Sequence, residues 1–185
     1  MPTEMTNGFD IGDDQKVIDI LSKWTGGPIS DALFTELARI IPQPCVETVI
    51  LRQNSVIEVL LVPRPANDPV WPGMLHSPGQ TLRAGDFFRD DHTPINGPFE
   101  RVQKNEIKTS FNSPPEFVAI AQYMTKRGPE AVTIYLATIY SQANLPAGAG
   151  WYKVQQLETL ENFISHQLTA INLAVAKFTT YAKNK

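Results

Sequence analysis

Leu60-Leu61-Val62-Pro63-Arg64-Pro65 and, a few residues later, Trp71-Pro72-Gly73-Met74-Leu75-His76-Ser77-Pro78-Gly79 are the stretches that decide the fold. The aliphatic residues at the start of the first stretch close a run from Val56 to Val62 that has the composition of a β-strand. The prolines and glycines that follow predict a long loop ending in a Pro-Gly turn. A strand that runs through an arginine into such a turn is the landmark from which the rest of the chain is placed.

Upstream of this landmark the sequence predicts one more strand and two helices. The run from Cys45 to Leu51 is strand-like, and only four polar residues separate it from Val56, so the two runs predict a β-hairpin. Apolar residues at helical spacing predict helices from Gln15 to Trp24 and from Ser30 to Ile40. These helices form an expected N-terminal extension, residues 1–42.

Downstream, residues 43–183 are expected to form one domain that contains the hairpin. A short helix is predicted from Phe99 to Ile107, and prolines bracket an apolar segment from Phe117 to Met124. Ala131 to Tyr140 is rich in β-branched and aromatic residues and predicts a strand. An amphipathic pattern predicts a long final helix from Leu157 to Ala182. The alternation of strands and helices predicts an α/β fold with a mixed sheet.

Composition and charge exclude several classes of function. The chain has 185 residues and a net charge of −3, so it lacks the basic field that favours binding of nucleic acid. Its single cysteine, Cys45, excludes an internal disulfide and a multi-cysteine zinc site. No apolar run is long enough to span a bilayer, and the polar, acidic N-terminus lacks the pattern of a secretion signal. We therefore expect a cytoplasmic protein without a nucleic-acid or membrane partner.

The landmark stretch resembles the entrance to the signature motif of the Nudix hydrolases, the Nudix box. In that family a strand ends in an arginine, and a tryptophan-containing loop leads to a Pro-Gly turn. The later segments Phe117–Ala121, Ala131–Thr138 and Trp151-Tyr152 also lie where the family has its later elements. The resemblance covers roughly residues 43 to 178, and it implies a Nudix-type α/β/α sandwich preceded by the N-terminal helices.

The box itself departs from the family pattern. Gly79 matches its first glycine, and Asp86 stands one residue after the position of its first glutamate. The segment from Arg101 to Ile107 keeps the arginine and only the last glutamate, Glu106. The interval between Asp86 and Arg101 is about twice as long as in the family. The resulting insertion, residues 87–98, carries Arg89 and three residues that either form a metal-ligand cluster or are simply solvated: Asp90, Asp91 and His92.

The resemblance implies Mg²⁺ (or Mn²⁺) as cofactor, because Nudix sites hold the hard cation with several carboxylates and with phosphate oxygens. It implies Glu106 and Asp86 as catalytic groups, and Glu106 with the Gly79 carbonyl as metal ligands. The remaining residues are then substrate contacts: Arg64, Trp71, Arg83, Arg101 and His76. Glu106 and Gly79 can hold at most one metal, and a cluster of two or three metals cannot be built from these residues. The site is therefore degenerate.

Each of these residues also has a purely structural interpretation. Arg64 either binds a phosphate or forms an ion pair with Glu106 or Glu100. Trp71 either stacks on a base or closes its loop against the sheet. His76 is either an acid or base or a packed imidazole.

The other candidates leave similar choices open. Arg101 either contacts substrate or orients the carboxylates of the box. Arg83 follows the turn and can reach a phosphate. Glu106 is either a ligand or an exposed helix carboxylate. His166, on the predicted final helix, is interpreted as a histidine at the edge of the core.

The segment around Glu106 is also similar to the box of GDP-mannose mannosyl hydrolase, a Nudix relative with an incomplete signature that uses one metal. Its catalytic histidine has no counterpart here, because the loop from Asn144 to Gly150 lacks a histidine.

Three functions remain open. The first is a Mg²⁺-dependent hydrolase of a nucleoside diphosphate derivative or nucleotide sugar. The second is a catalytically inactive Nudix-fold module that binds such a small molecule or regulates a partner. The third is a homodimeric structural or regulatory protein that pairs through the N-terminal helices or through the Ala131 strand.

Overall fold

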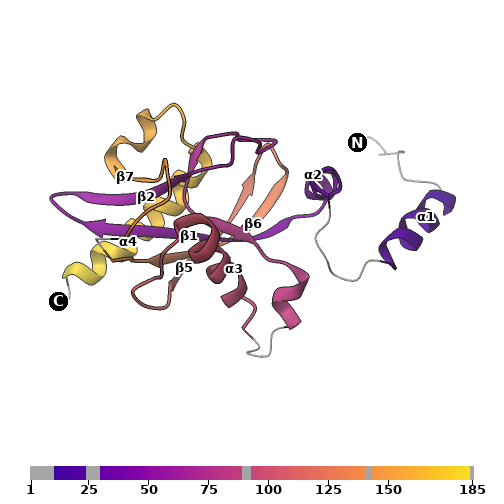
Figure 1. The fold of residues 1–185 in the computed structure, drawn as a ribbon, viewed down its shortest axis with the longest axis horizontal. Coiled ribbons are helices and arrows are strands. Elements are labelled where there is room, and N and C mark those ends of the chain that lie inside the picture. Colours follow the sequence, from indigo (N-terminus) through magenta and orange to yellow (C-terminus); the bar gives the residue numbers. More distant parts are fainter. Residues whose placement is uncertain (1–10, 24–29, 89–92, 141–142, 184–185) are drawn as a thin grey trace, which may run out of the picture. The chain divides into compact units, whose positions relative to one another are not determined.

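The computed structural model describes residues 11–23, 30–88, 93–140 and 143–183 (Figure 1). Contacts divide the chain into two compact units, Met1–Ser30 and Asp31–Lys185. The first unit contains α1 (Ile11–Leu21), which begins four residues before the predicted start at Gln15 because the apolar spacing marks only part of the helix. The side chains of residues 15–23 are all exposed. The predicted end at Trp24 lies outside the described residues.

The second unit is built on a seven-stranded sheet in which β4 and β7 lie off the main path, whose order is β3-β2-β1-β6-β5. The strands are β1 (Gln43–Gln53), β2 (Ile57–Pro63), β3 (Leu75–His76), β4 (Gly79–Thr81), β5 (Glu116–Met124), β6 (Pro129–Ala137) and β7 (Gly150–Lys153). β1 and β2 pair antiparallel, as in Leu51 with Val59, so the predicted hairpin is confirmed. β1 and β6 run parallel from Gln43–Glu130 to Ile50–Ala137, so the sheet is mixed, as expected.

β1 is the strand that organises this sheet. One of its sides pairs with β6, and its other side pairs first with β4 and then with β2. Residues 46–51 of this strand are buried without interruption, which explains its nearly continuous apolar sequence. β4, which carries Gly79, is thereby fixed next to the centre of the sheet.

Helices cover both faces of the sheet. On one face, alternate residues of β1, β2 and β6 pack against α4 (Leu168–Lys183), and the core there includes Val49, Leu61, Ile134 and Ile171. On the other face, Ile50, Leu60 and Val62 pack against Val102 and Ile107. The alternation of the two sets along each strand follows from the two-residue period of β-structure. The result is an α/β/α sandwich.

The predicted helix from Phe99 to Ile107 is present in two parts. It begins as α3 (Asn96–Arg101) and continues as the π-helical turn η2 (Val102–Ile107). The turn ends at Lys108, which has a φ of 53°. A π-helical turn is wider than an α-helical turn and often marks a functional site.

The final helix is shorter than predicted. The predicted start at Leu157 is wrong, because the chain forms the 3₁₀ turns η3 (Val154–Thr159) and η4 (Ser165–Gln167) before α4 begins at Leu168. The reason lies between these turns. The backbone N–H of Leu75 donates to Asn162 O at 2.7 Å, and the N–H of Ile164 donates to Leu75 O at 3.0 Å. These bonds to β3 hold the segment extended and interrupt the apparent helical pattern.

Two features bear on pairing with other chains. The Ala131 strand, β6, lies between β1 and β5 and therefore has no free edge. The expectation that it pairs with a second copy is wrong. α2 (Asp31–Ile40) belongs to the second unit, and its end approaches the β5–β6 turn so closely that a Cβ on Gly128 would lie 2.0 Å from Ala38 O.

None of the described helices is both long and apolar enough to cross a membrane. The further short helix is η1 (Ala84–Phe88).

Candidate functional site

Gly79, on β4, and Glu106, on the π-helical turn, lie against each other. The backbone N–H of Gly79 donates to Glu106 Oε2 at 3.1 Å, and the Gln80 side-chain amide donates to Glu106 Oε1. A Cβ at position 79 would lie 2.7 Å from Val46 O, so glycine is what allows β4 to approach β1. Both oxygens of the carboxylate are therefore engaged by protein donors.

Burial governs the protonation of Glu106 and of the neighbouring His76. It raises the pKa of Glu106 to about 7, and the hydrogen bonds from Gln80 and Gly79 only partly oppose that effect. His76 Nε2 lies 3.8 Å from Glu106 Oε2, and burial, together with the positive charge of Arg64, lowers the pKa of His76 to about 3. His76 is thus a packed, neutral imidazole near neutral pH.

Asp86 and Arg101 form a second, separate pair. Arg101 donates through Nη1 to Oδ1 at 2.6 Å and through Nη2 to Oδ2 at 2.8 Å, and Nη2 also donates to Thr81 O. The backbone N–H of Arg83 donates to Asp86 Oδ2 at 2.8 Å. Burial would raise the pKa of Asp86, but the hydrogen bonds from Arg101 and Arg83 outweigh it, and the pKa is lowered. Arg101 thus orients the Asp86 carboxylate through a two-bond contact.

The loop after β2 is closed by Asp68, a residue that the sequence analysis did not single out. Arg64 donates to Asp68 Oδ2 through both Nε and Nη2, whereas the expected ion pair was with Glu106 or Glu100. Asp68 Oδ1 accepts from the N–H groups of Val70 and Trp71. The ring of Trp71 is 7% exposed and closes the loop against the fold. The Asp68-Pro69 dipeptide is the turn signal that could have identified this residue.

The structure therefore distributes the predicted residues over three groups. His76, Gly79 and Glu106 lie together, and Asp86 lies with Arg101. Arg64 and Trp71 meet through Asp68. Arg83 has an exposed side chain and contributes its backbone to the second group. The residues Arg89 to His92 of the insertion lie outside the described residues.

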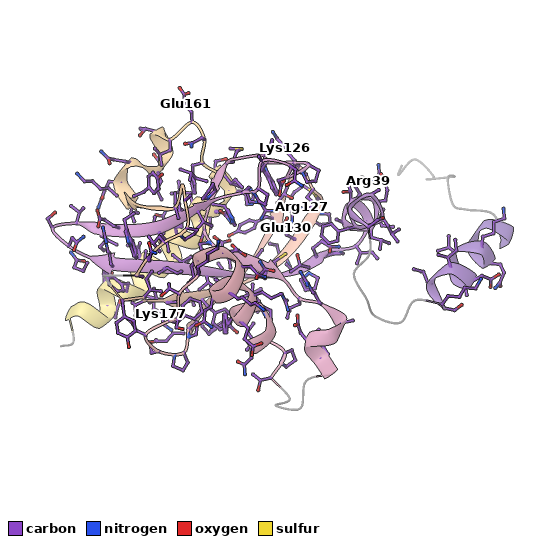
Figure 2. The ribbon with its side chains drawn as sticks, viewed as in Figure 1. Arg39, Lys126, Arg127, Glu130, Glu161 and Lys177 are labelled. Atoms are coloured by element: carbon purple, nitrogen blue, oxygen red, sulfur yellow. The ribbon has the colours of Figure 1, made fainter. Side chains whose placement is uncertain are left out.

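A further group, which we call the acid–aromatic cluster, occupies the α4 side of the sheet end: Glu47, Trp71, Tyr123, Arg127, Glu130 and His166. The rings of Tyr123 and Trp71 lie 5.3 and 5.5 Å from that of His166, and the Arg127 guanidinium lies 4.9 Å over the Trp71 ring. Figure 2 places Arg127 and Glu130 close to each other beside the β5–β6 hairpin.

Two polar atoms of the acid–aromatic cluster stand out. Glu47 Oε1 and Tyr123 Oη are buried, and neither makes a hydrogen bond of good geometry among the residues that the structure describes, although the Ala170 backbone lies near the Tyr123 hydroxyl. Burial and the charge of Glu130 raise the pKa of Glu47 well above its ordinary value. Glu47 is the residue by which the sequence could have revealed this cluster. It is a charged residue inside the apolar run Cys45–Leu51, and such residues are seldom buried without a reason.

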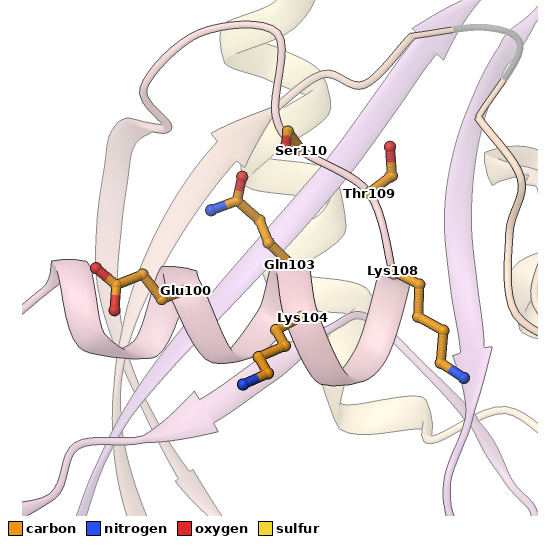
Figure 3. Close-up of a pocket in the computed structure, with 6 residues that line it drawn as sticks. All are labelled: Glu100, Gln103, Lys104, Lys108, Thr109 and Ser110. Atoms are coloured by element: carbon orange, nitrogen blue, oxygen red, sulfur yellow. The ribbon is translucent and has the colours of Figure 1, made fainter.

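A separate hollow of about 710 Å³ lies on the outer side of the π-helical turn (Figure 3). It is lined by Glu100, Gln103, Lys104, Lys108, Thr109 and Ser110. Gln103 shapes it, because its side chain donates to Phe99 O and accepts from the Phe111 N–H. None of the predicted site residues lines this hollow.

No family model matches the sequence, and no curated protein matches it. Solved structures do match. The Nudix domain of Shewanella oneidensis NrtR, complexed with ADP-ribose, is 17% identical over 81% of this chain and 99% of that domain, with a TM-score of 0.58. The chain has the Nudix fold. An Ap4A hydrolase binary complex from C. elegans is 16% identical over 75% of this chain and 98% of the hydrolase, with a TM-score of 0.55.

Another Nudix-fold match is the structure of S. oneidensis NrtR complexed with a 27mer DNA, at 18% identity and a TM-score of 0.59. This chain covers 63% of that protein and matches over 75% of its own length. The expected α/β/α sandwich is confirmed by these matches, whereas the similarity to GDP-mannose mannosyl hydrolase stays a prediction.

The described residues do not fit the Mg²⁺ that the Nudix fold implies. Mg²⁺ needs several free oxygen ligands in octahedral geometry. Both oxygens of Glu106 accept hydrogen bonds from the protein, and both oxygens of Asp86 are held by Arg101. Among the described residues, no group of three or more histidine, cysteine or acidic side chains is arranged to hold a metal. We therefore derive no catalytic step through a metal.

Proposed function

We propose that the chain is a Nudix-fold module that binds a small nucleotide-like molecule without metal-dependent turnover. The observation that carries this proposal is the state of Glu106, whose two oxygens are hydrogen-bonded to Gly79 and Gln80. A carboxylate held in this way would have to give up both bonds to coordinate a metal or to polarise a water. The net charge of −3 supports a small ligand over nucleic acid.

The acid–aromatic cluster supports the choice of binding site. Trp71 is buried beneath Arg127, but the half-buried rings of Tyr123 and His166 lie beside the positive charge of that arginine. Glu47 Oε1 and Tyr123 Oη make no hydrogen bond of good geometry among the described residues, and a ligand can supply one to each. Arg64 and Arg83 are retained as candidate phosphate contacts.

Isothermal titration with ADP-ribose, in Mg²⁺ and in excess chelator, tests this function. We expect the same Kd in both buffers and no hydrolysis of the ligand during prolonged incubation. Hydrolysis that needs Mg²⁺ and that is abolished by Glu106→Gln would establish the hydrolase instead. Absence of binding to ADP-ribose and to a panel of nucleotides and nucleotide sugars would refute the binding module.

A pair of variants locates the site. Tyr123→Phe removes only the buried hydroxyl, so we expect ligand affinity to fall about tenfold, corresponding to one hydrogen bond. Tyr152→Phe makes the same change at a half-buried tyrosine on β7 and should leave affinity unchanged. Equal affinities for both variants and the unaltered chain would place the ligand elsewhere.

A further inference from the structure

β5 forms an edge of the sheet. Its inner side pairs with β6 along its whole length, from Glu116 to Met124. On its outer side, no strand among the described residues pairs with it. The Lys177 side chain, from α4, donates to Phe117 O at 2.5 Å and so occupies one backbone acceptor at the start of the strand. The stretch after Phe117 remains a row of backbone groups available to another chain.

A bulge gives this strand an apolar face opposite α4. Val118, Ala119, Ala121 and Tyr123 all pack toward the α4 side, and the register shift between Phe117 and Ala119 explains how Val118 and Ala119 share it. Phe117, Ile120 and Met124 therefore lie on the other face together with the exposed, polar Gln122, and the three apolar side chains are 50%, 69% and 81% exposed. We call the three apolar residues the β5 patch.

Apart from the bulge near its start and the charge of Glu116, the strand carries none of the features by which natural edge strands avoid pairing. Between Glu116 and Lys126 there is no charged residue and no proline. Natural edge strands usually carry an inward charge, a lysine or a proline against unwanted association. A nine-residue edge strand with an exposed apolar face is therefore a surface for strand addition.

The charges at its two ends favour a second copy of the same strand. Glu116 lies at the start, beside Lys177 at 3.6 Å, and Lys126 follows the end. Figure 2 shows Lys177 and Lys126 far apart. An antiparallel pair of β5 strands brings Glu116 of one copy toward Lys126 of the other. A parallel pair would instead place Lys126 of one copy beside Lys126 of the other, and the like charges would repel.

We propose that β5 pairs antiparallel with β5 of a second copy of this chain, about a two-fold axis near Ile120. The two sheets then continue into one another across the axis. The two β5 patches join on one face, with Ile120 beside its own copy and Phe117 near Gln122 and Met124 of the other chain. A closed two-fold pair also removes the edge that could otherwise recruit further chains.

Sedimentation equilibrium of the full chain, at tens of micromolar, tests the pairing. We expect the mass of two chains for the unaltered protein and the mass of one chain for Ile120→Lys. Ile40→Lys is the matched control, because Ile40 on α2 is 68% exposed and undergoes the same substitution. It should remain a dimer. A monomeric unaltered protein, or a dimer that is broken by Ile40→Lys and not by Ile120→Lys, would overturn the proposal.

Crosslinking gives a second measurement that does not depend on weakening the interface. Directly opposed residues in an antiparallel pair have Cβ atoms close enough for a disulfide. Ile120→Cys should form a disulfide-linked dimer under mild oxidation, whereas Ile40→Cys should not. The natural thiol, Cys45, is half-buried, and burial raises its pKa to about 11, so it gives little background. A dimeric protein in which Ile120→Cys fails to crosslink would place its interface away from β5.

Discussion

At the scale of single residues, Asp68 is the side chain on which the conformation of the loop after β2 depends most directly. Burial would raise its pKa, but the hydrogen bonds from Trp71, Arg64 and Val70 lower it to about 2. An ordinary value near 3.8 in the unfolded chain makes the difference worth about 2 kcal/mol of folding free energy at neutral pH.

Asp68→Asn should therefore lower the free energy of unfolding by about 2 kcal/mol at pH 7. Because the folded-state pKa is depressed, this contribution is present above pH 4 and disappears as the pH falls toward 2. Urea denaturation of both chains between pH 2 and 7 would follow it. A difference that stays constant down to pH 2 would show that the variant acts through packing and not through the charge.

Individual residues also show how far the sequence predicts a site. The position of Glu106 next to Gly79 followed from the resemblance to the Nudix box, and the structure brings the two together. The partners that occupy Glu106 and Arg64 did not follow. Gln80 and Asp68 are side chains whose role depends on the local path of the backbone, which no periodicity encodes.

At the scale of secondary-structure elements, Gly128 couples α2 to the β5–β6 turn. Its φ is 138°, and a Cβ there would lie 2.0 Å from the carbonyl oxygen of Ala38. Gly128→Ala should therefore cost on the order of 1–3 kcal/mol of stability, through backbone strain and displacement of α2. Gly85→Ala is the control, since a Cβ on Gly85 meets no atom within 4 Å. Chemical denaturation curves that coincide for both variants would contradict the close approach of α2.

The elements themselves were predicted best where the apolar pattern and local hydrogen bonding agree. β1, β2 and the hairpin between them satisfy both conditions. The segment from Leu157 to Gln167 does not, because its apolar residues have helical spacing but its backbone bonds to Leu75 instead. Long-range hydrogen bonds of this kind are invisible to periodicity, so the start of the final helix was predicted too early.

At the scale of the whole molecule, the division into two units leads to a prediction for the N-terminal segment. The side chains of residues 15–23 are exposed, so this part of the first unit buries little surface. A chain lacking residues 1–30 should keep the free energy of unfolding to within about 0.5 kcal/mol. It should also keep its dimeric mass, because the proposed interface lies on β5. A large loss of stability or of the dimer on this deletion would assign the segment that contains α1 a structural role.

The fold as a whole was accessible from the sequence, because a sandwich of this type needs only landmarks in the right order. The landmark at Arg64 and Gly79, the Ala131 strand and the final helix supply that order. Which strand ends the sheet was not accessible. The Ala131 strand has the stronger strand composition, yet it lies inside the sheet, and the weaker segment from Phe117 to Met124 forms its edge.

The parallel pairing of β1 with β6 also sets the order in which the chain can fold. Its partners, such as Gln43 and Glu130, lie almost half the chain apart, whereas β1 and β2 are joined by a short turn. Closing the longer loop costs more chain entropy and slows the step that depends on it. During synthesis, the β1–β2 hairpin can form before β6 has been made, and the side of β1 that pairs with β6 is then still unpaired. That nascent edge is where a chaperone would protect this protein.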